Sequence, residues 1–94
     1  MSEVRVANGI ISFDGRVVEA FGFKRGESRR MHVGHITGVE LKRKRLIGTL
    51  VEFHGDGPLE MLLDADVEDH QVPALEALLD EVRGAAAAAR QESR

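Results

Sequence analysis

Short apolar runs separated by Gly-containing turns fill the first two thirds of the chain. Between residues 37 and 43, apolar and charged residues alternate, which is the period of a half-buried strand. Val39 and Leu41 are expected to point inward, and Glu40 and Lys42 outward. Similar runs predict short strands, and the full set covers residues 4–6, 10–13, 16–21, 29–33, 37–43, 46–53 and 59–63.

The turns between these strands have recognisable chemistry. Asp14-Gly15 is a strong signal for a two-residue hairpin, because a type I′ turn requires positive φ at both central residues. That hairpin would place Ile11 beside Val18. Residues 34–36 are expected to connect two strands through one helical turn, and Gly48 to mark a bulge or a close approach.

The last third of the chain has helical spacing, which predicts an amphipathic helix with its apolar stripe on the core. Pro73 fits only in a first turn, so the helix should begin near residues 70–71 with Asp69 as its N-cap. Gly84 costs about 1 kcal/mol inside a helix, and we expect a frayed tail over residues 85–94. The Ala-rich end also leaves a helix-to-helix contact with a second copy as an alternative to core packing. The stripe consists of Val72, Leu75, Leu78, Leu79, Val82 and Ala86.

About seven strands followed by one helix predict an α+β fold. No linker or internal repeat divides the 94 residues, so residues 1–94 are expected to form a single domain. A small, strongly bent antiparallel sheet leaves an open side that one helix can cover. We therefore expect a bent antiparallel β-barrel or sandwich capped by the C-terminal helix.

Composition narrows the classes of function. The chain has no Cys, which excludes disulfides, thiolate metal sites and a cysteine nucleophile. The N-terminal residues lack a signal-peptide pattern, and no apolar run reaches the roughly 20 residues that span a bilayer. A cytoplasmic location is expected. The net charge of −3 argues against general affinity for nucleic acid, so no nucleic-acid partner is expected.

Charge is strongly divided along the sequence. Residues 24–45 carry eight basic and two acidic side chains, a net charge of +6, whereas residues 46–82 carry ten acids and no Lys or Arg. A small domain with two opposed charged regions is suited to docking, including onto a second copy of itself. The candidate binding residues are the basic patch, which comprises Arg29, Arg30, Lys42, Arg43, Lys44 and Arg45.

Three stretches of the chain resemble a known family. Residues 9–15 form an opening hairpin, residues 31–42 a strand, a turn and an I-x-x-V-E-x-K strand, and residues 45–53 the next hairpin strand. With the closing helix, they are similar over most of residues 9–83 to the bacterial PH-like (pleckstrin-homology-like) domains of actinobacterial proteins, a family of unassigned function. The resemblance implies a bent, seven-stranded barrel or sandwich with a helix at one end. The chain lacks the helix Trp of eukaryotic PH domains, so their binding of inositol phosphates does not carry over.

Motifs for catalysis or metal binding are incomplete. Asp64 begins an acidic run, but the Gly and Glu that an EF-hand loop needs at positions six and twelve are Asp69 and Leu75. The four His residues lack the spacing of a zinc site, and no Ser lies in a nucleophile motif. Glu40 and Glu52 could pair across neighbouring strands, although outward-facing strand acids are mostly just exposed. We expect no enzyme activity, metal or cofactor.

The basic run at residues 42–45 has three interpretations: a solvated hairpin tip, a contact for an acidic protein surface, or a site for phosphate groups. The favoured hypothesis is a non-catalytic interaction module that binds a protein partner or forms a homo-oligomer. The alternative is peripheral binding to an anionic membrane surface, where each Lys or Arg contributes about 1 kcal/mol.

Overall fold

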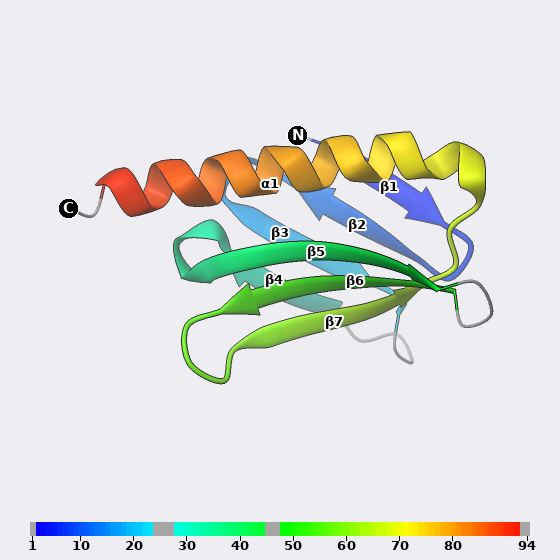
Figure 1. The fold of residues 1–94 in the computed structure, drawn as a ribbon, viewed down its shortest axis with the longest axis horizontal. Helices are drawn as coiled ribbons and strands as arrows, with labels where there is room; N and C mark the ends of the chain where they lie inside the picture. Colours follow the sequence, from blue (N-terminus) through cyan, green and yellow to red (C-terminus); the bar gives the residue numbers. More distant parts are fainter. Residues whose placement is uncertain (1, 24–27, 45–47, 93–94) are drawn as a thin grey trace.

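The computed structural model describes residues 2–23, 28–44 and 48–92. Within them, seven antiparallel strands form two sheets of order β1-β2-β3-β4 and β5-β6-β7, followed by one long helix (Figure 1). Two short 3-10 helices, η1 (Val33–His35) and η2 (Asp69–Gln71), precede β5 and the helix α1 (Val72–Glu92). The strands are β1 Ser2–Val6, β2 Gly9–Phe13, β3 Val17–Phe21, β4 Ser28–His32, β5 Ile36–Lys44, β6 Gly48–Gly55 and β7 Glu60–Ala65.

The two sheets form a sandwich, and α1 lies along one side of it against β1, η1 and β5 (Figure 1). The expected α+β class, with seven strands and one C-terminal helix, is confirmed. Of the two expected forms, the structure has the sandwich, because the described strands belong to two separate sheets rather than to one closed barrel. The helical turn expected between two strands is η1.

The core lies between the inner faces of the two sheets and the apolar stripe of α1. Burial alternates along β7, where Met61, Leu63 and Ala65 are buried and the residues between them are exposed. Val39 of β5 is also buried, as its place in the alternation predicts. The helix adds the buried side chains Leu75, Leu78, Leu79, Val82 and Ala86.

The β2–β3 hairpin has a longer turn than expected. Ile11 lies opposite Ala20, two residues beyond the expected partner, so the two-residue turn is wrong. Asp14 Oδ1 accepts hydrogen bonds from the backbone N–H groups of Arg16 and Val17, both at 2.8 Å, and this Asx turn stabilises the longer loop. The same bonds, that from Val17 first, hold the pKa of Asp14 below its ordinary value. Because the register shift is even, the predicted side chains still face the core.

The expected bulge or close approach at Gly48 is also wrong, because a Cβ there would meet nothing within 4 Å. Gly48 is the first residue of β6 and pairs with Lys44, with a φ of +93°. The register of the β5–β6 pair shifts instead between Ile36 and Gly38. A left-handed φ is accessible to glycine because it has no Cβ, so Gly48 serves the start of the strand rather than an irregularity within it.

One side chain ties the β1–β2 turn to the second sheet. Asn8 Nδ2 donates to the carbonyl oxygen of Asp64 at 2.6 Å, and Asn8 Oδ1 accepts from the backbone N–H of Asp66 at 2.8 Å. The N–H of Ala7 donates to the carbonyl oxygen of Asp66 at 3.3 Å. These bonds close one corner of the sandwich.

The start of the helical region corrects the expected N-cap. Glu68, not Asp69, precedes the first turn, and its backbone N–H donates to Gln71 Oε1 at 3.0 Å. Gln71 Nε2 in turn donates to the carbonyl oxygen of Arg5 at 2.7 Å, which fastens η2 to β1. The α-helix then begins at Val72, slightly later than expected.

The end of α1 differs from the expected frayed tail. The helix continues through Gly84 to Glu92, and residues 93–94 lie outside the described part. Ala86 is buried, and Ala85 and Ala89 pack against the core. Tertiary contacts of these small side chains therefore offset the cost of Gly84. They also show that this part of the Ala run packs on the protein's own core.

Candidate interaction surface

The basic patch is divided between faces of the sandwich. Neighbouring residues on a strand point to opposite faces. Arg29 is half-buried on the side of Met31, whereas Arg30 is exposed on the outer face of the first sheet. Lys42 and Arg43 are both exposed, but as neighbours on β5 they point to opposite faces of the second sheet. The described members of the patch therefore do not form one continuous surface.

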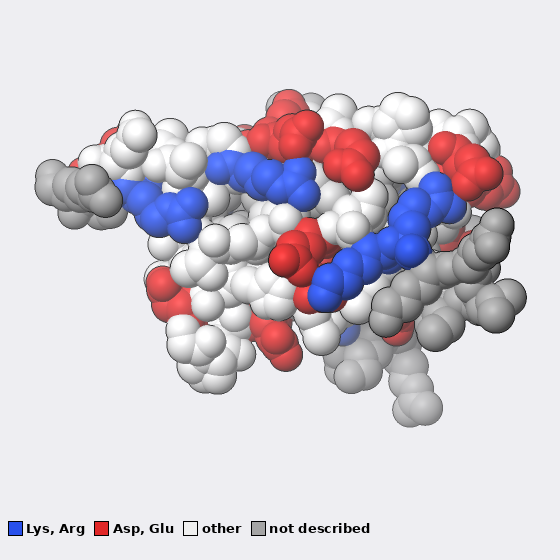
Figure 2. All heavy atoms as spheres, viewed as in Figure 1, with Lys and Arg blue, Asp and Glu red and all other residues white. Residues whose placement is uncertain are grey.

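The remaining two members of the patch add no described contact. Arg45 lies outside the described residues, and so does the side chain of Lys44. Figure 2 shows Lys and Arg interleaved with Asp and Glu on the face in view, so the division of charge along the sequence is partly neutralised in space. Three members already have acidic partners: Arg30–Glu19 at 3.4 Å, Lys42–Glu52 at 3.0 Å and Arg43–Asp69 at 2.9 Å.

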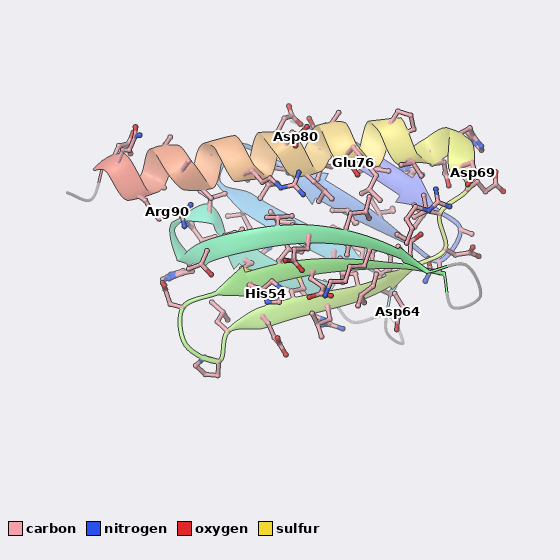
Figure 3. All side chains as sticks on the ribbon, in the orientation of Figure 1. His54, Asp64, Asp69, Glu76, Asp80 and Arg90 are labelled. Carbon is pink, nitrogen blue, oxygen red and sulfur yellow. The ribbon has the colours of Figure 1, made fainter. Side chains whose placement is uncertain are left out.

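The most organised polar cluster lies on the outer face of β5 and β6. Glu40 pairs directly with Glu52 across the two strands, as their positions in sequence suggested. Lys42 Nζ lies 3.5 Å from Glu40 Oε2 and 3.0 Å from Glu52 Oε2, and His54 Nε2 lies 2.8 Å from Glu52 Oε1. Figure 3 shows His54 on this second sheet. We call these four residues the Glu52 cluster.

Glu52 is 7% exposed, although its sequence position predicted an exposed acid. Leu62 of β7 pairs with it and Lys42 lies against it, so neighbouring side chains cover it. The hydrogen bond from Lys42 lowers the pKa of Glu52, helped by His54 and opposed by burial. Glu52 in turn raises the pKa of Lys42, with a smaller contribution from Glu40. Lys42 and Glu52 are thus held in their charged forms at neutral pH.

The Glu52 cluster has ligand atoms that could hold a cation, because those of Glu40, Glu52 and His54 lie within 4.8 Å of one another. The Lys42 ammonium already provides the positive charge that these carboxylates require. A metal ion would have to displace two ion pairs to bind. The geometry therefore indicates a cross-strand ion-pair network that stabilises the β5–β6 pair.

Two of the four sheet edges are covered on the side of α1. On β1, the carbonyl oxygen of Arg5 accepts from the side chain of Gln71. On β5, the carbonyl oxygen of Val39 accepts from Arg83 Nη2 at 3.1 Å and Nε at 3.3 Å. Backbone groups on both edges are therefore used within the chain.

The other two edges, β4 and β7, lie away from α1 (Figure 1), apart from the last residue of β4, His32, which lines a hollow with Ala85 and Ala89 of the helix. Strand β4 has the sequence SRRMH, with two Arg and no acid, and β7 has the sequence EMLLDA, with two acids and no base. Leu62, in the middle of β7, is 39% exposed. The charges of these strands are visible in the sequence, but their places at the sheet edges are not.

Comparisons with protein-family models, with curated proteins and with solved structures found no match. In the part of the chain that the structure describes, no helix has the length and apolar character needed to cross a membrane.

Proposed function

We propose that the chain is a non-catalytic, PH-like interaction module of the cytoplasm that binds protein, including a second copy of itself. One observation carries this proposal. Each of the two sheets has a strand edge on the side away from α1, and these edges have opposite charge, with β4 basic and β7 acidic. Exposed strand edges are templates for pairing with another chain, and soluble domains ordinarily cover or blunt them.

The proposed binding surface differs from the basic patch that the sequence suggests. The basic patch is divided between faces and partly neutralised by Glu19, Glu52 and Asp69. The Arg30–Glu19 pair lies at the surface, where such pairs contribute about 0–1 kcal/mol, so it leaves Arg30 free to exchange partners. The opposed charges that favour docking are best represented by β4 and β7.

Light scattering coupled to size-exclusion chromatography tests the proposal. At low salt and increasing protein concentration, we expect a mass above that of the monomer. Screening charges that lie on the surface weakens their attraction, so the mass should fall as salt rises. A strictly monomeric chain at every concentration and salt level would contradict self-association.

Binding to anionic lipid through the basic patch has less support. Of its described members, Lys42 and Arg43 point to opposite faces of β5, and both are paired with acids. A membrane surface would contact only one of these faces at a time. Sedimentation with anionic vesicles at low salt distinguishes the two functions, because the protein-binding module should stay in the supernatant.

A further inference from the structure

The hydrogen-bond pattern shows which backbone groups of β4 point outward. The N–H of Val33 donates to the carbonyl oxygen of Arg16 at 2.8 Å and continues the β3–β4 ladder. In an antiparallel pair, alternate residues face the partner strand and the open edge. Arg29 and Met31 therefore face β3, and the backbone groups of residues 28, 30 and 32 face the open edge.

The backbone groups of β7 alternate in the same way. The N–H of Gly55 donates to the carbonyl oxygen of Leu59 at 2.8 Å, so odd-numbered residues face β6 and even-numbered residues face outward. Asn8 confirms this alternation, because its side chain bonds the carbonyl oxygen of Asp64 and the N–H of Asp66. The backbone groups of Glu60 and Leu62 remain, with no hydrogen bond to described residues on that side.

Charge decides which edges can meet. If β7 paired with β7 of a second copy around Leu62, Glu60 would lie opposite Asp64, and the like charges would repel. If β4 paired with β4 around Arg30, two guanidinium groups would meet. Pairing between β4 and β7 brings unlike charges together instead.

We propose that β4 of one copy pairs antiparallel with β7 of the next, with Arg30 opposite Leu62. His32 then lies opposite Glu60, and Arg30 lies diagonally between Glu60 and Asp64, within reach of both carboxylates. The contact is head-to-tail, so it forms a ring if its rotation closes and a filament if it does not. This inference rests on the proposed function and specifies the surface and the partner.

Proline substitution tests the pairing. In Leu62→Pro and Arg30→Pro, the lost N–H points to the open edge, so the ladder within the chain keeps its bonds, and proline is found on edge strands for this reason. Each variant alone retains one functional edge and should be monomeric. Mixed in equal amounts, they should form a dimer of one copy each, because the intact β4 of Leu62→Pro meets the intact β7 of Arg30→Pro.

Leu62→Val and Arg30→Lys are the matched controls, because both keep the N–H and should assemble as the wild type does. Far-UV circular dichroism checks the fold. If either proline variant fails to fold, the double substitution of Glu60 and Asp64 to Arg provides the test, because both side chains are exposed. That variant should bind at least tenfold more weakly.

Three results separate the inference from the proposed function. If the wild type assembles and the folded proline variants assemble equally well, the edge pairing is wrong and the proposed function still stands. If the wild type assembles but the mixture of the two proline variants stays monomeric, the edge pairing is again wrong and the proposed function still stands. A wild-type chain that never assembles overturns self-association, and the edge pairing with it.

Discussion

Asn8 is expected to stabilise the sandwich more than its exposed position suggests. Its side chain makes two hydrogen bonds to the end of β7, at 2.6 and 2.8 Å, and joins the β1–β2 turn to the other sheet. Asn8→Ala removes both bonds. A hydrogen bond contributes about 0.5–1.5 kcal/mol net, and water can reach the groups left behind, so we expect a loss of about 1–2 kcal/mol. For a domain of this size, that lowers the Tm by about 4–16 °C.

The chain has no Trp or Tyr, so thermal unfolding is best followed by far-UV circular dichroism. Gln91→Ala is the matched control, because it removes an exposed amide of similar chemistry that has no hydrogen bond to described residues. It should change the free energy of unfolding by less than about 0.5 kcal/mol. If Asn8→Ala has the same Tm as this control, the two hydrogen bonds of Asn8 contribute nothing to the stability of the sandwich.

Two further predictions concern β6 and its partner β5. Gly55→Ala should destabilise the fold by about 1–3 kcal/mol, because the new Cβ would lie 2.8 Å from the carbonyl oxygen of His35. In the control Gly38→Ala, the new Cβ has nothing within 4 Å, so the free energy of unfolding measured in urea should be nearly unchanged. Equal effects would contradict this reading. Glu52 has a lowered pKa when folded, so its contribution is present above the ordinary glutamate pKa and is lost as pH falls through the folded value. Wild type should therefore lose stability on acidification more steeply than Glu52→Gln; parallel pH profiles would refute this.

The order of elements and the direction of most side chains could be predicted from the sequence. Alternation placed Val39 in the core and Lys42 on the surface, and helical spacing identified the buried stripe of α1. These features depend on local periodicity, which each segment carries by itself. The acidic residues that precede α1 could also be recognised in the sequence, although the first residue of the helix could not be fixed.

Features that depend on particular side-chain contacts, whether within one turn or between distant segments, could not be predicted. The length of the β2–β3 turn follows from the Asp14 side chain, which competes with the type I′ geometry that Asp-Gly favours. Burial of Glu52 requires Leu62 from β7 and Lys42 from β5, and neither neighbour is evident from the alternation along β6. The basic patch was drawn from residues adjacent in sequence, whereas a strand sends adjacent residues to opposite faces.

The cover that Gln71 and Arg83 give to β1 and β5 also limits stoichiometry. Among the described residues, each sheet has one terminal strand that the rest of the chain leaves uncovered, so strand pairing can engage at most two neighbours, one at each of these strands. A branched assembly would need a third strand edge for pairing, and α1 lies against the two edges that remain. If chains assemble by this route, growth is therefore confined to one dimension, and a small amount of Leu62→Pro would stop it at the end that presents β7.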